Sequence, residues 1–306
     1  MTARTVRVPA TTANLGSGFD AVGMALDLCS DFTFDLTGSG LRVDVEGIGA
    51  AQLPTTQENL VFRSFAATCQ RLGSPVPRDL HLRIHNRIPL GGGLGSSAAA
   101  VVAGVVGAFH ITGAELDPQR LLDCAAALEN HPDNIAPALF GGVVVGAMQT
   151  EHVRFLRFAP PPALTAVVAT PQFHVSTDES RARLPASVSR ADAVFNLSRC
   201  GLLVGALQAG RMDLLAAATE DRLHQDSRLA RIPGGVTALQ AARQAGAVAC
   251  ALSGSGPTVL ALLDRRAGCE AAVLAAIEQA FALAGVGVVA RVIEPTCAGA
   301  VAWHDR

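Results

Sequence analysis

One block of the chain is suited to binding phosphate. Residues 88–104 read IPLGGGLGSSAAAVVAG, so a β-type segment runs into a turn with four glycines and then into two serines that open an apolar helix. Glycines let a backbone approach an anion closely, and the N–H groups and dipole of a helix N-terminus attract phosphate. An ordinary capped helix after a turn explains one glycine and one serine, but not the whole block. The block therefore predicts a phosphate-binding loop.

The absence of lysine restricts the chemistry that this loop can support. All 24 basic residues among the 306 are arginine. A Walker A loop, a protein kinase built on a strand lysine and Schiff-base catalysis are therefore excluded. Any phosphate site in this chain has to use backbone N–H groups, helix termini, arginine or a metal ion.

The composition is that of a globular protein with a large core. Hydrophobic residues make up 50% of the chain and charged residues only 16%, which excludes disorder. The formal net charge of −2 provides no basic surface for nucleic acid, and no apolar run reaches the roughly 18 residues that a membrane span needs. The seven cysteines are widely spaced and lack a CxxC pair, which favours buried thiols over disulfides or zinc sites.

Strands and long helices follow one another in mixed order, which predicts an α+β protein with two lobes. The expected strands lie at 6–9, 31–36, 41–48, 80–90, 140–147 and 163–169, with a strand pair around 253–256 and a last strand near the C-terminus. The expected helices lie at 58–72, 96–110, 118–129, 191–210, 212–222, shortly before Gly246 and at 270–283. The Pro-rich run at 159–163 is stiff and cannot continue a helix, so we expect one domain at 1–160 and a second at 161–306.

Two further loops share the small polar character of the first. Residues 9–20 read PATTANLGSGFD and residues 251–262 read ALSGSGPTVLAL. Either loop alone is a weak signal, because each could be a tight turn. The three loops together resemble the GHMP kinase superfamily, which carries an N-terminal substrate loop, a PxxxGLGSSAA phosphate loop and a C-terminal glycine-rich loop in this order. The resemblance extends from Val6 to about Thr258.

Within that superfamily, four local blocks resemble the homoserine kinase family. They are PATTANLGSGFDAVGMAL from Pro9, HPDNIAPALFGG from His131, HVSTDESRARLP from His174 and DRLHQDSRLARIPG from Asp221. The departures from the family pattern are small. Thr11, Thr12 and Ser17 replace Ser-Ser and Pro in the first block, Ser180 replaces Ala in the third, and Asp226–Ser227 stands where the family often has Pro-Tyr in the fourth. The last departures lie beside the expected carboxylate clamp and leave the identity of the amino-acid substrate open.

The resemblance implies a two-domain GHMP kinase fold, with a ribosomal-protein-S5-domain-2-like N-terminal domain and a ferredoxin-like C-terminal domain. The implied reaction moves the γ-phosphoryl group of MgATP to the side-chain hydroxyl of L-homoserine, on the route to threonine. Such enzymes are cytoplasmic and commonly homodimeric. ATP and Mg²⁺ are the implied cofactors, and no nucleic acid or membrane partner is expected.

The resemblance also assigns site residues. The nucleotide is expected against Pro89, Leu90, Gly91, Gly92, Gly93, Leu94, Gly95, Ser96, Ser97, Ala98 and Ala99, and near Asn59, for which a helix N-cap role is equally favoured. Mg²⁺ is expected on Ser97, or on Ser96 instead, and on Glu129. The amino acid is expected among Asn14, Asp20, His131, Thr177, Arg181, Arg228 and Gly254, with arginine as the clamp for its carboxylate because no lysine is available.

The implied catalysis lacks a side-chain general base. Several kinases of the superfamily have an aspartate near the transferred phosphoryl group, whereas Asn134 occupies that position here. An amide cannot take a proton at neutral pH, but it can orient a phosphate oxygen or the hydroxyl. We therefore expect Asn134 and Asn14 to act as catalytic positioning groups. Asp133 is the rival candidate for a base, with a structural capping role as its alternative.

Two other functions stay open at this point. One is a kinase of the same superfamily that acts on another hydroxy amino acid or small alcohol. The other is a non-catalytic ATP or ligand sensor built on the same fold, which loss of the serines or of the metal carboxylate would favour. Ser96, Ser97 and Glu129 are all present, so a kinase is the favoured function.

Overall fold

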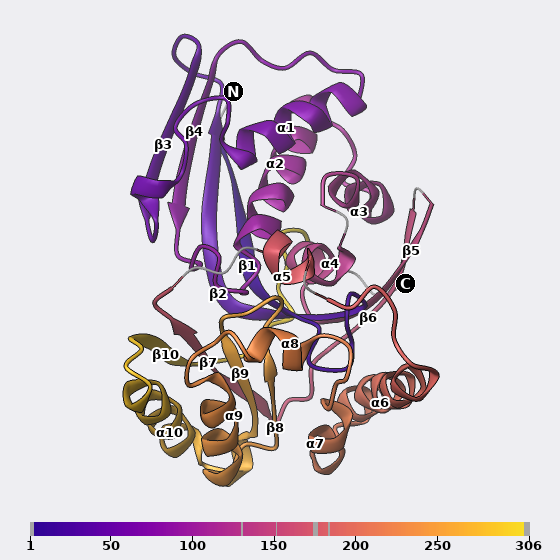
Figure 1. Cartoon of the computed structure of the whole chain (residues 1–306). Coiled ribbons are helices and arrows are strands. Elements are labelled where there is room, and N and C mark those ends of the chain that lie inside the picture. Colours follow the sequence, from indigo (N-terminus) through magenta and orange to yellow (C-terminus); the bar gives the residue numbers. More distant parts are fainter. Residues whose placement is uncertain (1–2, 130, 151, 174–176, 183, 303–306) are drawn as a thin grey trace.

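The structure is a computed structural model that describes residues 3–129, 131–150, 152–173, 177–182 and 184–302. Its N-terminal half contains a six-stranded sheet in the order β3-β4-β2-β5-β6, with β1 paired to β2. Helices α1 to α4 pack against one side of this sheet (Figure 1). The strands are β1 (Arg4–Ala13), β2 (Val22–Asp35), β3 (Leu41–Gly47), β4 (Leu80–Asn86), β5 (Val143–Gln149) and β6 (His152–Phe158). The helices are η1 (Ala50–Gln52), α1 (Leu60–Arg71), α2 (Ser96–Thr112), α3 (Pro118–Ala126) and α4 (Pro132–Phe140).

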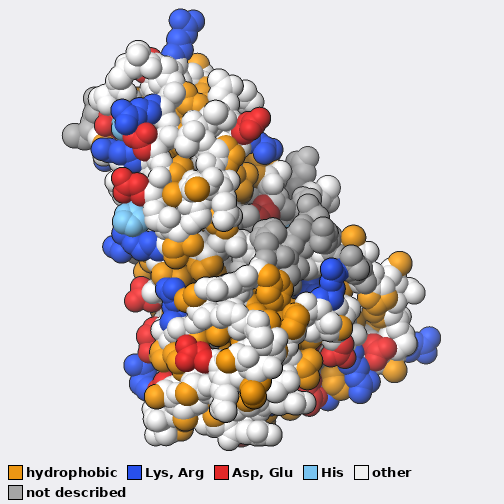
Figure 2. All heavy atoms as spheres, turned by 60° about the vertical axis from the view of Figure 1, so that its left-hand side comes forward, with side chains coloured by type: hydrophobic (Ala, Val, Ile, Leu, Met, Phe, Trp, Pro, Cys, Tyr) orange, Lys and Arg blue, Asp and Glu red, His pale blue; other side chains and the backbone are white. Residues whose placement is uncertain are grey.

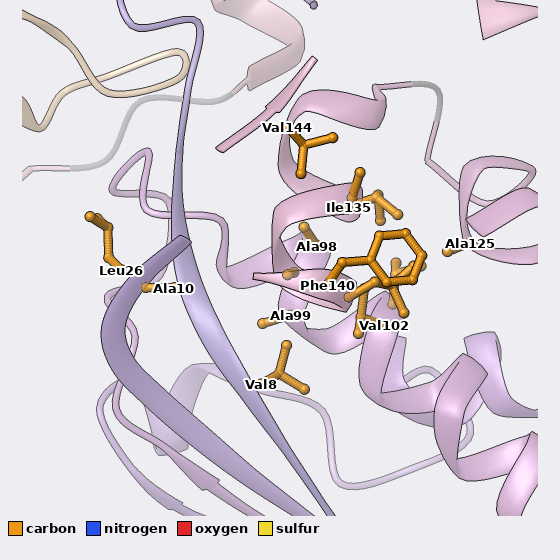
Figure 3. Close-up of a cluster of buried hydrophobic side chains, with 14 of the residues drawn as sticks. Val8, Ala10, Leu26, Ala98, Ala99, Val102, Ala125, Ile135, Phe140 and Val144 are labelled. Carbon is orange, nitrogen blue, oxygen red and sulfur yellow. The ribbon is translucent and has the colours of Figure 1, made fainter. Parts of the chain in front are cut away.

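Helix α2 occupies the middle of the N-terminal core, and small side chains make this possible. Figure 3 shows Ala98, Ala99 and Val102 of α2 among apolar side chains of β1 and α4. A Cβ added at Gly104 would lie 2.5 Å from the carbonyl oxygen of Val61 in α1. The helix therefore packs against both the sheet and α1, and this burial fixes the position of its N-terminus, where the glycine-rich loop ends.

The C-terminal half has the ferredoxin-like topology that the resemblance implied. Its four strands are antiparallel in the order β10-β7-β9-β8, and α9 and α10 pack on this sheet. The pattern is a split βαβ unit repeated as β-α-β-β-α-β. The elements are β7 (Leu164–Pro171), α5 (Thr177–Ala182), α6 (Arg190–Ala209), η2 (Met212–Leu214), α7 (Leu215–Ala218), α8 (Gln225–Leu229), α9 (Gly235–Gln244), β8 (Ala249–Leu252), β9 (Val259–Asp264), η3 (Arg265–Ala267), α10 (Glu270–Leu283) and β10 (Val288–Ile293).

The Pro-rich run at 159–163 connects the last strand of the N-terminal sheet to the first strand of the C-terminal sheet, and the chain crosses between the two halves once more. The segment after β10 returns to the N-terminal half, where Thr296 and Ala25 pair through their backbones and Val301 N–H donates to Leu139. One apolar cluster also includes residues of both sheets, among them Val8 of β1 and Leu262 of β9. The two halves are therefore packed as one body along their shared face.

The structure differs from the expected elements in several places. The first strand continues through Thr12 to Ala13, because these residues pair with β2 and are buried. The expected helix at 212–222 is only η2 and α7, because the carboxylate of Asp221 accepts the N–H groups that begin α8. Phe140 ends α4 rather than starting a strand, and β6 was not anticipated.

The surface that Figure 2 displays carries arginine and acidic side chains scattered among apolar and neutral ones. This fits the small net charge of −2. No helix in the described part of the chain is long and apolar enough to cross a membrane.

Candidate active site

A cavity of about 580 Å³ lies where the two halves meet. The loop after β1, the glycine-rich loop before α2, the start of α4, and helices α5 and α8 all contribute to it. In Figure 1, α5 and α8 lie between the two sheets. The lining residues are Asn14, Asp20, Leu60, Gly91, Gly92, Gly93, Gly95, Ser96, Ser97, Val101, Leu128, Glu129, His131, Asp133, Asn134, Arg181, Arg228, Gly254 and Ser255.

The glycine-rich loop can adopt its shape only because it lacks side chains at two points. Gly93 and Gly95 have φ of 81° and 72°, in the left-handed region. A Cβ at Gly93 would lie 2.3 Å from the carbonyl oxygen of Ser253, and one at Gly95 would lie 2.0 Å from Thr11 Oγ1. The loop is thus pressed against β1 and against the β8–β9 turn, and those contacts fix its path.

The N-terminus of α2 opens into this cavity. Its N-cap is Gly95, which has no side chain to cap the first turn of the helix, and Ser96 and Ser97 line the cavity directly. The first N–H groups of a helix have no partner within the helix. Because the helix dipole adds positive potential here, this end of the cavity is suited to a phosphate group.

Ser97 and Glu129 face each other at this end of the cavity. Ser97 Oγ lies 3.4 Å from Glu129 Oε1. Desolvation by burial raises the pKa of the Glu129 carboxyl to about 7, and the hydrogen bond from Ser97 opposes the shift. A hydroxyl and a carboxylate are hard oxygen donors, and a carboxylate with this unfavourable surrounding would be stabilised by a nearby cation. The pair therefore fits Mg²⁺.

No cluster of three or more His, Cys, Asp or Glu side chains that could hold a metal occurs in the described residues. Mg²⁺ keeps several water or phosphate ligands and uses few protein oxygens, so a cation that enters with a nucleotide suits Ser97 and Glu129.

Asn134 is held in one orientation by β1. Thr11 Oγ1 donates a hydrogen bond of 2.7 Å to Asn134 Oδ1. Since the amide oxygen is occupied in this way, the Nδ2 group of Asn134 is the donor left for the cavity. Asn134 can therefore donate to a phosphate oxygen or to an acceptor hydroxyl, and it cannot accept a proton from one.

Asn14 connects the substrate loop to the C-terminal half. It has φ of 71°, its Nδ2 donates to the carbonyl of Gly254, and its Oδ1 accepts from the backbone N–H of Asp20. Both ends of the amide are engaged with the protein. Asn14 thus fixes the positions of Asp20 and Gly254 at the edge of the cavity.

Two arginines from different helices line the other end of the cavity. Arg181 of α5 donates to Asp20 Oδ1 at 2.7 Å and lies 3.4 Å from His131 Nδ1. Arg228 of α8 donates through Nη1 to His224 Nδ1 at 2.9 Å and to the carbonyl of Gly254 at 3.3 Å. Burial lowers the pKa of Arg228 from its ordinary value. Two guanidinium groups beside one cavity form a natural site for a carboxylate.

Three buried side-chain atoms in the described residues lack a hydrogen-bond partner, and all three belong to residues of this cavity. They are Asp133 Oδ1, Arg181 Nε and Arg228 Nε. An unsatisfied buried polar atom is costly and rare in folded proteins. The two arginine Nε–H groups are donors without a partner, and the aspartate oxygen is an acceptor without a partner. The residues of this cavity therefore suit a ligand that has both an acceptor and a donor group.

Asp133 is the most perturbed acid of the site. It is 3% exposed, and its pKa is raised to about 7 by burial first and then by the nearby carboxylates of Asp20 and Glu129, with Arg181 opposing. It lies in the first turn of α4, where a carboxylate also interacts favourably with the helix dipole.

Most of the predicted site residues meet in the cavity. Those that line it are Asn14, Asp20, Gly91, Gly92, Gly93, Gly95, Ser96, Ser97, Glu129, His131, Asn134, Arg181, Arg228 and Gly254. Those that do not line it are Asn59, Pro89, Leu90, Leu94, Ala98 and Ala99, of which the last three are buried in the core. Thr177 begins α5, but its side chain lies outside the described part of the structure.

Asn59 has the structural role that was the alternative to adenine binding. Its Oδ1 accepts from Val61 N–H at the start of α1, and its Nδ2 donates to the carbonyl of Pro54. The next residue, Leu60, does line the cavity together with Val101 and Leu128. These apolar side chains beside the phosphate loop were not anticipated, because single Leu and Val residues in helices carry no signal that distinguishes a ligand wall from a core.

Comparison with known families identifies the class of protein. The family model for the GHMP kinases N terminal domain matches residues 59–142, and the model for the GHMP kinases C terminal matches residues 203–281. The glycine-rich loop and the start of α4 fall within the first match, and α8 and the β8–β9 turn fall within the second. Fold, cavity and family models agree on a GHMP kinase.

Curated relatives narrow this class. A homoserine kinase from Moorella thermoacetica is 46% identical over 296 residues, covering 97% of this chain and 98% of the relative. One from Carboxydothermus hydrogenoformans is 44% identical and covers 92% and 90%. The crystal structure of homoserine kinase from Cytophaga hutchinsonii superposes with a TM-score of 0.87 at 29% identity, covering 96% of this chain and 95% of that one. The chain belongs to the homoserine kinase family of GHMP kinases.

Proposed function

We propose that the protein transfers the γ-phosphoryl group of MgATP to the side-chain hydroxyl of L-homoserine, which gives O-phospho-L-homoserine and ADP. The observation that carries this proposal is that one cavity is lined both by groups suited to phosphate and by groups suited to a carboxylate. One end holds the uncapped N-terminus of α2, and the other holds two buried, unpartnered arginine Nε–H groups. The membership in the homoserine kinase family supports the choice of substrate.

The nucleotide would bind with its phosphates on the backbone of the glycine-rich loop and its base toward Leu60, Val101 and Leu128. The chain has no lysine to cradle the phosphates. Backbone N–H groups and a helix dipole can supply the same stabilisation. Mg²⁺ held by Ser97 and Glu129 would offset the charge that develops on the transferred group.

The amino acid would bind with its carboxylate on Arg181 and Arg228, which present unused donors. Asp20, fixed by Asn14 and paired with Arg181, is the acidic group available for the substrate ammonium. The hydroxyl of the four-carbon side chain would then extend toward Asn134 and the phosphate end. A shorter hydroxy amino acid, anchored at the same clamp, would hold its hydroxyl farther from the phosphoryl group.

Catalysis would rest on positioning and charge stabilisation. Phosphoryl transfer has a loose transition state, so the proton of the attacking hydroxyl can leave late and a strong base is not required. Asn134 donates through Nδ2 because Thr11 occupies its oxygen. Asp133 lies next to it with a raised pKa, and we assign it a structural and electrostatic role at the start of α4 rather than that of general base.

An ADP-release assay tests the proposal. With MgATP, we expect L-homoserine to give the highest kcat/KM among L-homoserine, L-serine, L-threonine, 4-hydroxybutyrate and 3-aminopropan-1-ol. 4-Hydroxybutyrate lacks the ammonium, and 3-aminopropan-1-ol lacks the carboxylate. Each compound should therefore lose the contribution of one charged hydrogen-bonded contact, which lowers kcat/KM roughly 10- to 100-fold. A higher kcat/KM for another acceptor would show that the enzyme serves a different hydroxy compound, and ATP binding without turnover of any acceptor would favour a sensor.

A cytoplasmic location and a homodimeric state are further parts of the proposal. All seven cysteines are free thiols, which suits a reducing compartment. Light scattering of the purified protein should give a mass of about twice the 31.4 kDa of the chain. A mass equal to one chain at micromolar concentration would contradict the dimer.

A further inference from the structure

One side chain that forms a hydrogen bond with Arg228 does not itself line the cavity. His224, at the start of α8, has a side chain with 0% exposure. Its Nδ1 lies 2.9 Å from Arg228 Nη1, and its Nε2 lies 2.9 Å from the carbonyl oxygen of Gly16. A guanidinium only donates and a carbonyl only accepts. These two partners therefore fix one neutral tautomer, in which Nε2–H donates to Gly16 and Nδ1 accepts from Arg228.

The charged groups around the imidazole are consistent with this neutral form. Burial lowers the pKa of His224, and Arg228 lowers it further, whereas Asp221 and Asp20 oppose the shift. The carboxylate of Asp221 already accepts the backbone N–H groups of Leu223, His224 and Gln225. His224 is therefore an acceptor for Arg228 at neutral pH.

Phe19 packs against His224 and lies near both arginines. Its ring stacks on the imidazole of His224 with centroids 4.9 Å apart and an interplanar angle of 20°. The guanidinium carbons of Arg181 and Arg228 lie 5.5 Å and 5.4 Å from the same ring. A cation within about 6 Å of an aromatic ring is attracted to its face. One aromatic pair thus contacts both arginines of the proposed clamp.

We propose that His224 and Phe19 are positioning residues that orient Arg228 and Arg181 for the substrate carboxylate. The described hydrogen bonds of Arg228 both use Nη1, to His224 and Gly254, and its Nε–H has no hydrogen-bond partner in the described structure. The same histidine joins the loop after β1 to α8 through Gly16, so the clamp is set by both halves of the protein. This inference rests on the proposed function, because it assigns the carboxylate to these arginines.

Two substitutions at His224 separate its two hydrogen bonds. The amide of asparagine can place an acceptor near the position of Nδ1, whereas the amide of glutamine can place a donor near that of Nε2. We expect His224→Gln, which loses the acceptor for Arg228, to raise the KM for L-homoserine roughly 5- to 20-fold, with little change in kcat or in the KM for ATP. His224→Asn should recover part of that loss.

The comparison acceptor is 3-aminopropan-1-ol, which is homoserine without its carboxylate. If His224 acts through the clamp, His224→Gln should leave kcat/KM for this acceptor unchanged. Gln225→Met is the matched structural control, because Gln225 is a buried neighbour that bonds to Leu252 and Thr219 and not to Arg228. It should lower thermal stability and leave the KM for homoserine unchanged.

Equal losses with both acceptors, or the same rise in KM in Gln225→Met, would overturn the proposal. If His224→Gln does not fold, Phe19→Leu tests the same clamp, because it removes the ring beside both arginines and leaves His224 in place. Phe19→Leu should raise the KM for homoserine and spare 3-aminopropan-1-ol, and an unchanged KM would refute the assignment. Failure of the proposed function itself is distinct, because the wild-type enzyme would then release no ADP with homoserine.

Discussion

Replacing Gly95 with alanine tests whether the contact between the glycine-rich loop and β1 sets the reactive geometry. Gly95 has φ of 72°, and its added Cβ would lie 2.0 Å from Thr11 Oγ1 and 3.3 Å from Asn134 Oδ1. The hydroxyl of Thr11 cannot stay where it is, so its 2.7 Å hydrogen bond to Asn134 is broken or displaced. Gly95→Ala therefore perturbs the helix N-cap and the orientation of Asn134 together.

The size of the effect follows from two contributions. A left-handed conformation costs an alanine about 1–2 kcal/mol, and loss of one neutral hydrogen bond costs about 0.5–1.5 kcal/mol. We expect the free energy of unfolding to fall by about 1.5–3.5 kcal/mol. A misplacement of about 1 Å near the reacting atoms can cost about 100-fold, so kcat should fall on that order while the protein remains folded.

Gly113→Ala is the matched control at the other end of the same helix. Gly113 is the C-cap of α2 with φ of 71°, and its Cβ would meet no described atom within 4 Å. This variant carries the same backbone strain without the clash, so it should lose about 1–2 kcal/mol of stability and retain wild-type kcat. Urea unfolding and steady-state kinetics measure both. Equal kcat in Gly95→Ala and Gly113→Ala would refute the role of this contact.

Three further substitutions test the remaining roles. Glu129→Gln should raise the Mg²⁺ concentration for half-maximal rate about tenfold and recover activity in excess Mg²⁺; wild-type behaviour at limiting Mg²⁺ would remove Glu129 from the metal site. Arg181→Ala should raise the KM for the amino acid about 10- to 100-fold through loss of one charged contact, and an equal effect on the KM for ATP would contradict the clamp. Asp133→Asn should lower kcat less than about tenfold and keep the acidic limb of the pH–rate profile; loss of that limb with a fall of about 10²–10⁴-fold would identify a general base.

The elements with strong patterns could be predicted from the sequence, and those fixed by single side chains could not. Helices α1, α2 and α10 and the β8–β9 turn carry clear periodicity or glycine punctuation and lie close to the expected ranges. The start of α8 depends on the buried carboxylate of Asp221, which accepts the backbone N–H groups of His224 and Gln225 and the side-chain amide of Asn196. No periodicity reports such a contact in advance.

The same distinction applies to the candidate site. The loop residues were predicted because a cluster of glycines and serines before a helix is typical of a phosphate site. Arg181 and Arg228 were predicted from the resemblance to the homoserine kinase family. Phe19 and His224 were not singled out, because a stacked pair separated by 205 positions in the chain leaves no local pattern. Asn59 shows the opposite case, in which a polar residue near a motif proved to be a helix cap.

The acids and arginines of the cavity bear on how it would bind Mg²⁺ and an amino acid in the proposed complex. Asp20 and Glu129 both raise the pKa of Asp133, and Arg181 opposes them. Arg181 is itself shared, since it pairs with Asp20 and would also meet a substrate carboxylate. A zwitterion brings one charge of each sign to this end, where its ammonium can take over from Arg181 as a partner for Asp20. In the proposed complex, Mg²⁺ would add positive charge near Glu129 and so oppose the effect of burial, which raises the pKa of this carboxyl to about 7. In the proposed complex, the zwitterion and Mg²⁺ would each place an opposite charge beside a buried group, which would offset the cost of burying that group.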